Sequence, residues 1–157
     1  MLYTGTASNV TYGGSGALVA DVNKSMAFNG TSSRITSSAP IGSTAYTLSA
    51  WVKLTTAGQT AKGLIGRWAS STGVLVYLNG SGAFGLVHNS TYVQSTFVPA
   101  AGRWYAVTAT WDGTTAKLYV DGSVVAQGLA SGAPGAGATS FEIGSYNNAS
   151  STTFFAG

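Results

Sequence analysis

The stretch "RWYAVTATWDGTTAKLYVDGSVV", residues 103–125, indicates the fold more strongly than any other part of the chain. Two Asp-Gly pairs, Asp112-Gly113 and Asp121-Gly122, interrupt runs of β-branched and aromatic residues. Asp-Gly is typical of tight turns between antiparallel strands, because both residues tolerate the positive φ angles that such turns need. The stretch therefore predicts three short strands that follow one another in a meander.

Similar signals occur on both sides of this meander. "YTLSAWVKL" (46–54) alternates at a period of two, with one set of positions wholly apolar and the other made of Thr47, Ser49, Trp51 and Lys53. "FEIG" (141–144) is a further predicted strand. In "VLVYLNGSGAFGLVHN" (74–89), the turn residues 79–82 lie between two apolar arms, which predicts a hairpin. No helix of convincing length is indicated. Many short strands with turn dipeptides between them favour an antiparallel two-sheet sandwich or a barrel, and we expect the sandwich.

Composition sets limits on function. The 157 residues fit one domain, residues 1–157, and there is no cysteine for a disulfide, a thiolate nucleophile or a cysteine-bound metal.

Only 7% of residues are charged, against about 25% in an ordinary soluble domain, and such a low charge content is typical of secreted or virion proteins. The seven basic residues are scattered, which argues against a nucleic-acid partner. No run of roughly 18 apolar residues occurs, so we expect no membrane insertion.

Three stretches occur in an order that is more specific than composition: "GALVADVNKSMAFNGTSSRITSS" (16–38), "YTLSAWVKL" (46–54) and the meander at 103–125, followed by "FEIGSYN" (141–147). Together they resemble the laminin-G-like domains of the concanavalin-A-like lectin/glucanase superfamily, from about residue 13 onward. The resemblance implies an all-β jelly-roll sandwich. We expect Trp51, Trp104 and Trp111 to fill the space between its sheets.

The resemblance also bears on the two ends of the sequence. In the family, a strand follows the segment that reads "FFAG" here (154–157) and runs back near "MAFNG" (26–30), and a short strand precedes the segment at Tyr3. We expect these first and last strands to be missing, which would leave an open sheet edge that invites another strand. The expectation is that the chain is part of a longer polypeptide; the alternative is that another chain supplies the strand.

The acidic residues argue against an enzyme. They number four, Asp21, Asp112, Asp121 and Glu142, and no two have the short spacing that places paired carboxylates on one strand face. Hydrolysis of a glycosidic bond needs two carboxyl groups about 5–9.5 Å apart. The glucanase branch of the superfamily carries its acids close together on one strand, and that motif is absent. We expect Asp112 and Asp121 to form turns, and Glu142, which alternates with two apolar residues, to be solvated.

The remaining candidates are a calcium site at Asp21 and Asn23 and a catalytic base at His88. Asp21 and Asn23 lie where laminin-G-like domains often place ligands of a calcium site, so the resemblance implies a possible Ca²⁺ cofactor, with an ordinary polar loop as the alternative. His88 is the single histidine, and no cysteine or G-x-S-x-G serine accompanies it. We expect a strand-end residue there and not a catalytic base.

A glycan site is the most specific function that the residues suggest. Aromatic rings that have polar neighbours can stack on sugar rings, while nearby amides bind hydroxyl groups. Packing on the sheet face is the alternative role for these aromatic residues. The candidate ligand-binding residues are Trp68, Tyr77, Asn79, Asn89, Tyr92, Tyr146 and Asn147.

These observations predict a non-catalytic recognition module that binds glycan or another surface polymer. The resemblance to modules of bacterial exported and phage virion proteins places it outside the cell or on a virion surface. The alternative function is a structural virion or oligomer subunit whose open sheet edge pairs with a neighbouring chain.

Overall fold

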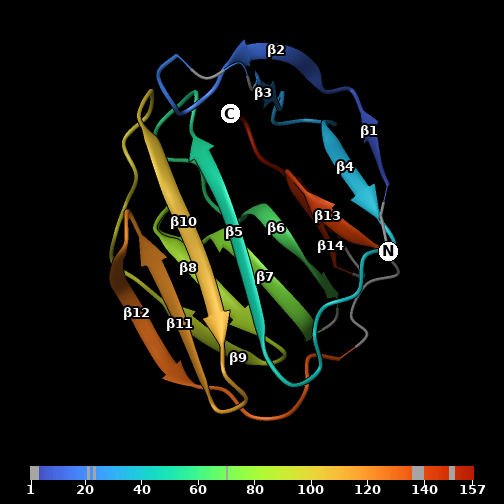
Figure 1. Ribbon diagram of the computed structural model, residues 1–157, viewed down its shortest axis with the longest axis vertical. Coiled ribbons are helices and arrows are strands. Elements are labelled where there is room, and N and C mark those ends of the chain that lie inside the picture. The colour runs from blue at the N-terminus through green and yellow to red at the C-terminus, as the bar shows by residue number, and fades with distance from the viewer. Residues whose placement is uncertain (1–3, 21, 23, 70, 136–139, 149–150) are drawn as a thin grey trace.

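The computed structural model describes residues 4–20, 22, 24–69, 71–135, 140–148 and 151–157, and in these the regular elements are all strands. Among the described residues there is accordingly no helix with the length and apolarity to cross a membrane. Two antiparallel sheets face each other, and two short hairpins, β2–β3 and β14–β15, flank them (Figure 1). The predicted all-β sandwich is confirmed.

The larger sheet has seven strands in the order β1-β4-β13-β6-β7-β8-β9. Neighbours in it pair antiparallel throughout, and the predicted hairpin at 74–89 forms β7 and β8. Its strands are β1 (Gly5–Ser8), β4 (Arg34–Ser37), β6 (Lys62–Ala69), β7 (Thr72–Leu78), β8 (Phe84–His88), β9 (Thr91–Gln94) and β13 (Phe141–Ile143).

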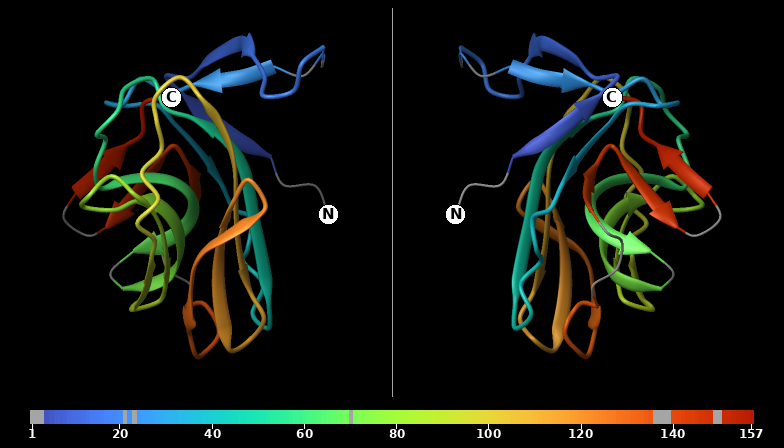
Figure 2. Two further views of the ribbon diagram at one scale, coloured as in Figure 1. Left: turned by 90° about the vertical axis from the view of Figure 1, so that its left-hand side faces the viewer. Right: turned by 90° about the vertical axis from the view of Figure 1, so that its right-hand side faces the viewer.

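The smaller sheet has four strands in the order β12-β11-β10-β5, and it contains the predicted meander. Its strands are β5 (Tyr46–Lys53), β10 (Trp104–Trp111), β11 (Thr115–Val120) and β12 (Ser123–Leu129). The flanking hairpins consist of β2 (Thr11–Ser15) with β3 (Lys24–Ala27), and β14 (Ser145–Asn148) with β15 (Ser151–Phe154). Figure 2 shows that the β2–β3 hairpin projects at one end of the sandwich, while the β14–β15 hairpin lies outside the larger sheet.

The turns of the meander form as the Asp-Gly pairs predict. Asp121 and Gly122 both have positive φ angles, 50° and 81°, and the Asp121 carboxylate accepts a hydrogen bond from the backbone N–H of Ala106 at 2.9 Å. The Asp112 carboxylate accepts the backbone N–H groups of Thr115 and Thr114, and these bonds lower the pKa of that carboxyl group. Both aspartates therefore have structural roles in turns.

The core lies between the two sheets, where the inward-facing residues of the facing strands are buried. Along β10 and β11 the burial alternates strictly, as expected for strands with one inward face. Phe84 and Leu86 of the larger sheet meet Val107 and Leu118 of the smaller one in the same apolar cluster. Burial of these side chains contributes about 1.5–3 kcal/mol each to folding.

Trp111 fills the core, whereas the prediction for the other two tryptophans of the smaller sheet is wrong. Trp111 is 3% exposed, and its indole N–H donates to the carbonyl oxygen of Ala130 at 2.7 Å. Trp51 is 51% exposed, because its neighbour Val52 points inward and alternation directs Trp51 outward. Trp104 pairs with Lys53 on the same outer face, where the Lys53 amine lies 4.9 Å from the centre of the indole ring.

Candidate functional site

The outer face of the seven-stranded sheet carries the aromatic residues that the sequence singled out. Core residues Val74, Val76 and Leu78 face inward, so Leu75 and Tyr77 face outward. The register then places Trp68, across from Gly73, and Tyr92, across from Val87, on this same outer face. We call this surface the aromatic face and define it by Trp68, Tyr77, Tyr92 and Tyr146.

Tyr146 reaches the aromatic face from another element. It belongs to β14, which packs against β6 so closely that a Cβ atom on Gly63 would lie 2.5 Å from the backbone of Ser145. Only glycine permits that approach. The rings of Tyr146 and Trp68 meet edge to face, with their centres 5.7 Å apart, a favourable arrangement for aromatic pairs. The β14–β15 hairpin thus supplies one wall of the site.

Tyr77 occupies the middle of the aromatic face. Its ring lies over Gly85, where a Cβ atom would be only 2.8 Å from the tyrosine Cε1 atom. Burial raises the pKa of Tyr77 to about 12, and the nearby phenol groups of Tyr92 and Tyr146 add to the rise. Tyrosines from β7, β9 and β14 therefore lie near one another here.

The floor of the aromatic face is apolar. Leu75 and Val87 pair with each other on the outer side of the sheet, yet they are only 2% and 1% exposed, so neighbouring side chains cover them. Tyr92 is 53% exposed, which gives the face an accessible ring above this floor. Sequence reasoning missed the floor, although the consecutive apolar residues 74–76 signal a strand that is covered on both sides.

The amides that the sequence proposed as sugar ligands have structural partners. Asn79 is 3% exposed, and its side-chain oxygen accepts the backbone N–H groups of Ser81 and Ala83 at 3.0 Å. The Asn89 side-chain oxygen accepts the N–H groups of Gly73 and Gly135, so it ties β7 to a distant loop. We therefore leave both asparagines out of the site. Asn147 lies on β14, but its side chain is outside the described part of the structure.

His88 is a structural residue at the end of β8. It is fully buried, and its Nε2 atom donates to the carbonyl oxygen of Gly132 at 2.8 Å. The Nδ1 atom then accepts the Tyr46 hydroxyl group at 3.2 Å. Burial raises the pKa of Tyr46, which keeps this phenol protonated as a donor. The histidine ring also packs against Trp111, with the ring centres 4.5 Å apart.

Glu142 differs from its prediction in one respect. The register with Gly66 and Leu75 directs it away from the core, as the alternation predicts. It is nevertheless only 4% exposed, because β14 follows directly in the chain and covers it, and its carboxylate accepts the Ser145 hydroxyl group. Expecting a solvated glutamate was therefore wrong, since a hairpin packs onto that face.

Neither an acid pair nor a metal cluster is found in the described residues. Asp112 and Asp121 hold turns of the smaller sheet, and Glu142 lies in the larger one. No group of three or more His, Asp or Glu side chains converges within these described ranges. The predicted calcium ligands Asp21 and Asn23 lie outside them.

Comparison with known proteins agrees with this architecture. The family model of the concanavalin A-like lectin/glucanases superfamily matches residues 28–157. The chain belongs to this superfamily. No curated protein matches the sequence significantly. The resemblance that the sequence motifs suggested is therefore confirmed at the level of the family.

Solved structures of similar fold include a domain in complex with an oligosaccharide and a carbohydrate binding module. Domain 4 of AbnA, an extracellular arabinanase from Geobacillus stearothermophilus solved with arabinotriose, has a TM-score of 0.70 at 19% identity, covering 98% of this chain and 77% of that one. The carbohydrate binding module CBM66 from Bacillus subtilis has a TM-score of 0.51 at 18% identity, covering 97% and 91%. The receptor binding domain of botulinum neurotoxin type G scores 0.66 at 15% identity, covering 90% and 38%. Because all three identities are below 20%, these similarities support the fold of this chain and do not by themselves show its ligand.

Proposed function

We propose that this chain is a non-catalytic module that binds a glycan, or another surface polymer of similar chemistry, on its aromatic face. The observation that carries the proposal is the convergence of Trp68, Tyr77, Tyr92 and Tyr146 over an apolar floor. The C–H faces of a sugar ring pack well against such rings, while phenol groups can bind its hydroxyl groups. The carbohydrate-binding modules among the similar folds support this proposal.

The low charge and the high content of small hydroxyl residues support a place outside the cell or on a virion surface. In such a place the module would hold a larger protein on a polysaccharide. The described carboxylates have structural partners, which supports a binding role over a hydrolytic one. Calcium stays a proposal that rests on Asp21 and Asn23 alone.

The test is sugar binding by a matched pair of variants. Arabinotriose and a panel of neutral oligosaccharides serve as probes in isothermal titration calorimetry. We expect Tyr92→Ala to weaken binding about tenfold, which corresponds to about 1.4 kcal/mol for one stacked ring. Trp51→Ala is the control, since Trp51 is exposed to nearly the same extent, 51% against 53%, but lies on the other sheet.

Two further results decide the interpretation. Tyr146→Ala should also reduce affinity while leaving the unfolding midpoint nearly unchanged. Equal affinity losses for Tyr92→Ala and Trp51→Ala would contradict the proposed face, and release of sugar from a polysaccharide by the unmodified chain would contradict the non-catalytic role.

A further inference from the structure

Gln94 is an exposed polar residue beside the aromatic face, at the end of β9 (Figure 1). It comes two residues after Tyr92, so both side chains point to the same side of the sheet, about 6.6 Å apart along the strand. The register pairs Gln94 with Gly85, and Gly85 with Tyr77, so these three residues form one row across the sheet. Gln94 is therefore placed to contact a molecule that packs on the Tyr92 ring.

The Tyr77 ring lies over the glycine that separates it from Gln94. Its Cζ atom is 3.2 Å from the Cβ position of Gly85, and its hydroxyl oxygen is 3.4 Å from it. Neighbouring strands are about 4.8 Å apart, so the next side chain across the sheet from this phenol group is that of Gln94. One sugar ring can therefore contact the Tyr77 hydroxyl group and the Gln94 amide together.

A buried neighbour, Asn79, fixes the orientation of the Gln94 amide. The Asn79 Oδ1 atom accepts the backbone N–H groups of Ser81 and Ala83, both at 3.0 Å. Backbone N–H groups only donate, so this atom must be the oxygen, and the other end of the Asn79 amide is its NH2 group. That NH2 group donates to the Oε1 atom of Gln94 at 3.0 Å.

The outward end of the Gln94 amide is consequently its NH2 group. Because Oε1 is turned toward Asn79, Nε2 lies on the other side of the planar amide. Within the described residues this NH2 group donates to no protein acceptor, and the side chain is exposed. The aromatic face is therefore bordered by an oriented hydrogen-bond donor that the fold itself does not use.

The surroundings of this donor are uncharged. The outward positions of β7, β8 and β9 hold only glycine, leucine, valine, tyrosine and glutamine. A charged sugar would find no counterion among these residues to compensate for the hydration that it loses on binding. An uncharged sugar loses less, and its oxygen atoms can still accept the Gln94 N–H group.

We propose that Gln94 determines the specificity of the aromatic face, because its amide N–H donates to an oxygen atom of an uncharged sugar whose ring packs on Tyr92. Asn79 is a positioning residue, since it holds Gln94 and does not touch the sugar. This inference rests on the proposed glycan binding, and it adds the class of sugar and the residue that selects it.

Calorimetric titration of the 157-residue chain tests the role of Gln94. Arabinotriose is the uncharged probe, and trigalacturonate is the charged one. Gln94→Met keeps the length of the side chain but removes its donor, and it should weaken arabinotriose binding about fivefold, as expected for one hydrogen bond between uncharged groups. Gln127→Met, at an exposed position of the smaller sheet, is the matched control and should leave affinity unchanged. Trigalacturonate should bind at least tenfold more weakly than arabinotriose.

Asn79→Asp tests the positioning role. Aspartate still accepts the N–H groups of Ser81 and Ala83, but it cannot donate to Gln94, so the Gln94 amide should turn over and present its oxygen outward. We expect about the same affinity loss as in Gln94→Met, and no further loss when the two substitutions are combined. Gln94→Met, at an exposed position, keeps the test decisive if Asn79→Asp does not fold.

Nuclear magnetic resonance measures the orientation of the amide without any sugar. In the unmodified chain, the side-chain NH2 protons of Asn79 should exchange slowly with water and those of Gln94 rapidly. In Asn79→Asp, the Gln94 protons should become the slow ones. Rapid exchange of the Asn79 NH2 protons in the unmodified chain would overturn the positioning role.

The binding results separate this inference from the function on which it rests. Full arabinotriose affinity in Gln94→Met, with the loss still present in Tyr92→Ala, would overturn the role of Gln94 and leave the proposed glycan site in place. Trigalacturonate binding as tight as that of arabinotriose would overturn the uncharged class. Failure of the unmodified chain to bind any of the sugars would contradict the proposed function itself, whatever orientation the exchange rates give for Gln94.

Discussion

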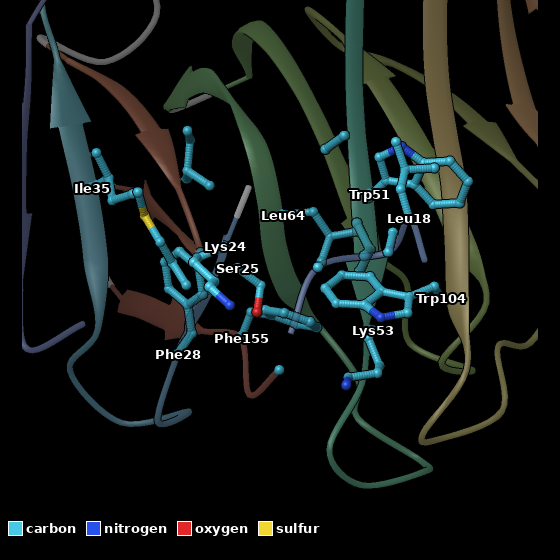
Figure 3. Close-up of a pocket in the computed structure, with 18 residues that line it drawn as sticks. Leu18, Lys24, Ser25, Phe28, Ile35, Trp51, Lys53, Leu64, Trp104 and Phe155 are labelled. Carbon is cyan, nitrogen blue, oxygen red and sulfur yellow. The ribbon is translucent and has the colours of Figure 1, made fainter. Parts of the chain in front are cut away.

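Tyr92 and Trp51 are exposed to almost the same extent, 53% and 51%, but they lie in regions of opposite character. Tyr92 is on β9, the edge strand of the seven-stranded sheet, near Tyr77 and above an apolar floor. Trp51 is on β5, which lacks a partner on one side within the described structure. Both rings thus lie on edge strands, and they differ in their surroundings. Tyr92 lies near Tyr77 on the aromatic face, which suits a sugar ring, whereas Trp51 lines a largely apolar cavity of about 480 Å³ beside β5 (Figure 3).

The largest expected effect separates a core tryptophan from the edge tryptophan. Trp111→Ala should lower the free energy of unfolding by about 3–5 kcal/mol, because it removes a buried ring that packs on Tyr46 and His88. Trp51→Ala should lower it by less than about 1 kcal/mol. Urea denaturation of both variants measures the difference. Similar losses would show that Trp51 is packed against other side chains.

The next largest effect concerns Gly85, which lies beneath the Tyr77 ring of the aromatic face. Gly85→Val should displace the Tyr77 ring, since even a Cβ atom would lie 2.8 Å from it. We expect a stability loss of about 1–3 kcal/mol from overpacking, together with weaker sugar binding. Gly80→Val is the control, because Gly80 has no neighbour within 4 Å of its Cβ position and no positive φ angle, and its sugar affinity should stay unchanged. Unchanged sugar affinity in Gly85→Val would remove Tyr77 from the site.

Alkaline pH should act on the aromatic face more than on the cavity beside β5, whose lining contains no tyrosine among the described residues. The pKa of Tyr77 is raised to about 12 from 10.0, so the folded state holds the phenol proton more tightly than the unfolded state does. The contribution of the protonated Tyr77 phenol to the free energy of unfolding is fully present below pH 10 and is lost as the pH rises through about 12. Thermal unfolding across this range should show a smaller alkaline decline for Tyr77→Phe than for the unmodified chain. An identical decline in both would assign the loss to other groups, such as Tyr46.

The smallest effect concerns the outer face of the four-stranded sheet. Lys53→Ala removes the amine above the Trp104 ring and should cost only about 0.5 kcal/mol, as expected for an exposed cation–π pair. Sugar affinity should not change. A loss of sugar affinity would show that the two regions are coupled, and the comparison between them would fail.

Much of the fold could be predicted from the sequence because its signals are local. A period of two in 46–54 and the Asp-Gly turns of the meander depend on neighbouring residues, and the structure confirms both. The family motifs agree with the matched family model. The glycine-rich turn at 79–82 likewise forms a hairpin, with Gly82 at a φ angle of 79°.

The candidate site was predicted only in part. Local composition selected the four aromatic residues, but it also selected Asn79 and Asn89, whose hydrogen bonds could not be foreseen. The oxygen of Asn89 binds Gly135, 46 residues away, and the burial of Glu142 depends on a hairpin that folds back over it. Alternation in 46–54 already directed Trp51 outward, so expecting it in the core gave too much weight to its size.

The sequence by itself determined that this chain is an all-β sandwich of the concanavalin A-like superfamily, with turns at its Asp-Gly pairs, because strand period and turn chemistry are local properties. Only the tertiary structure decided that Tyr77, Tyr92 and Tyr146 share one face and that β5 and β3 border one cavity. Those arrangements depend on register and on which strands become neighbours across the sheet, and both are set by packing between residues far apart in the chain.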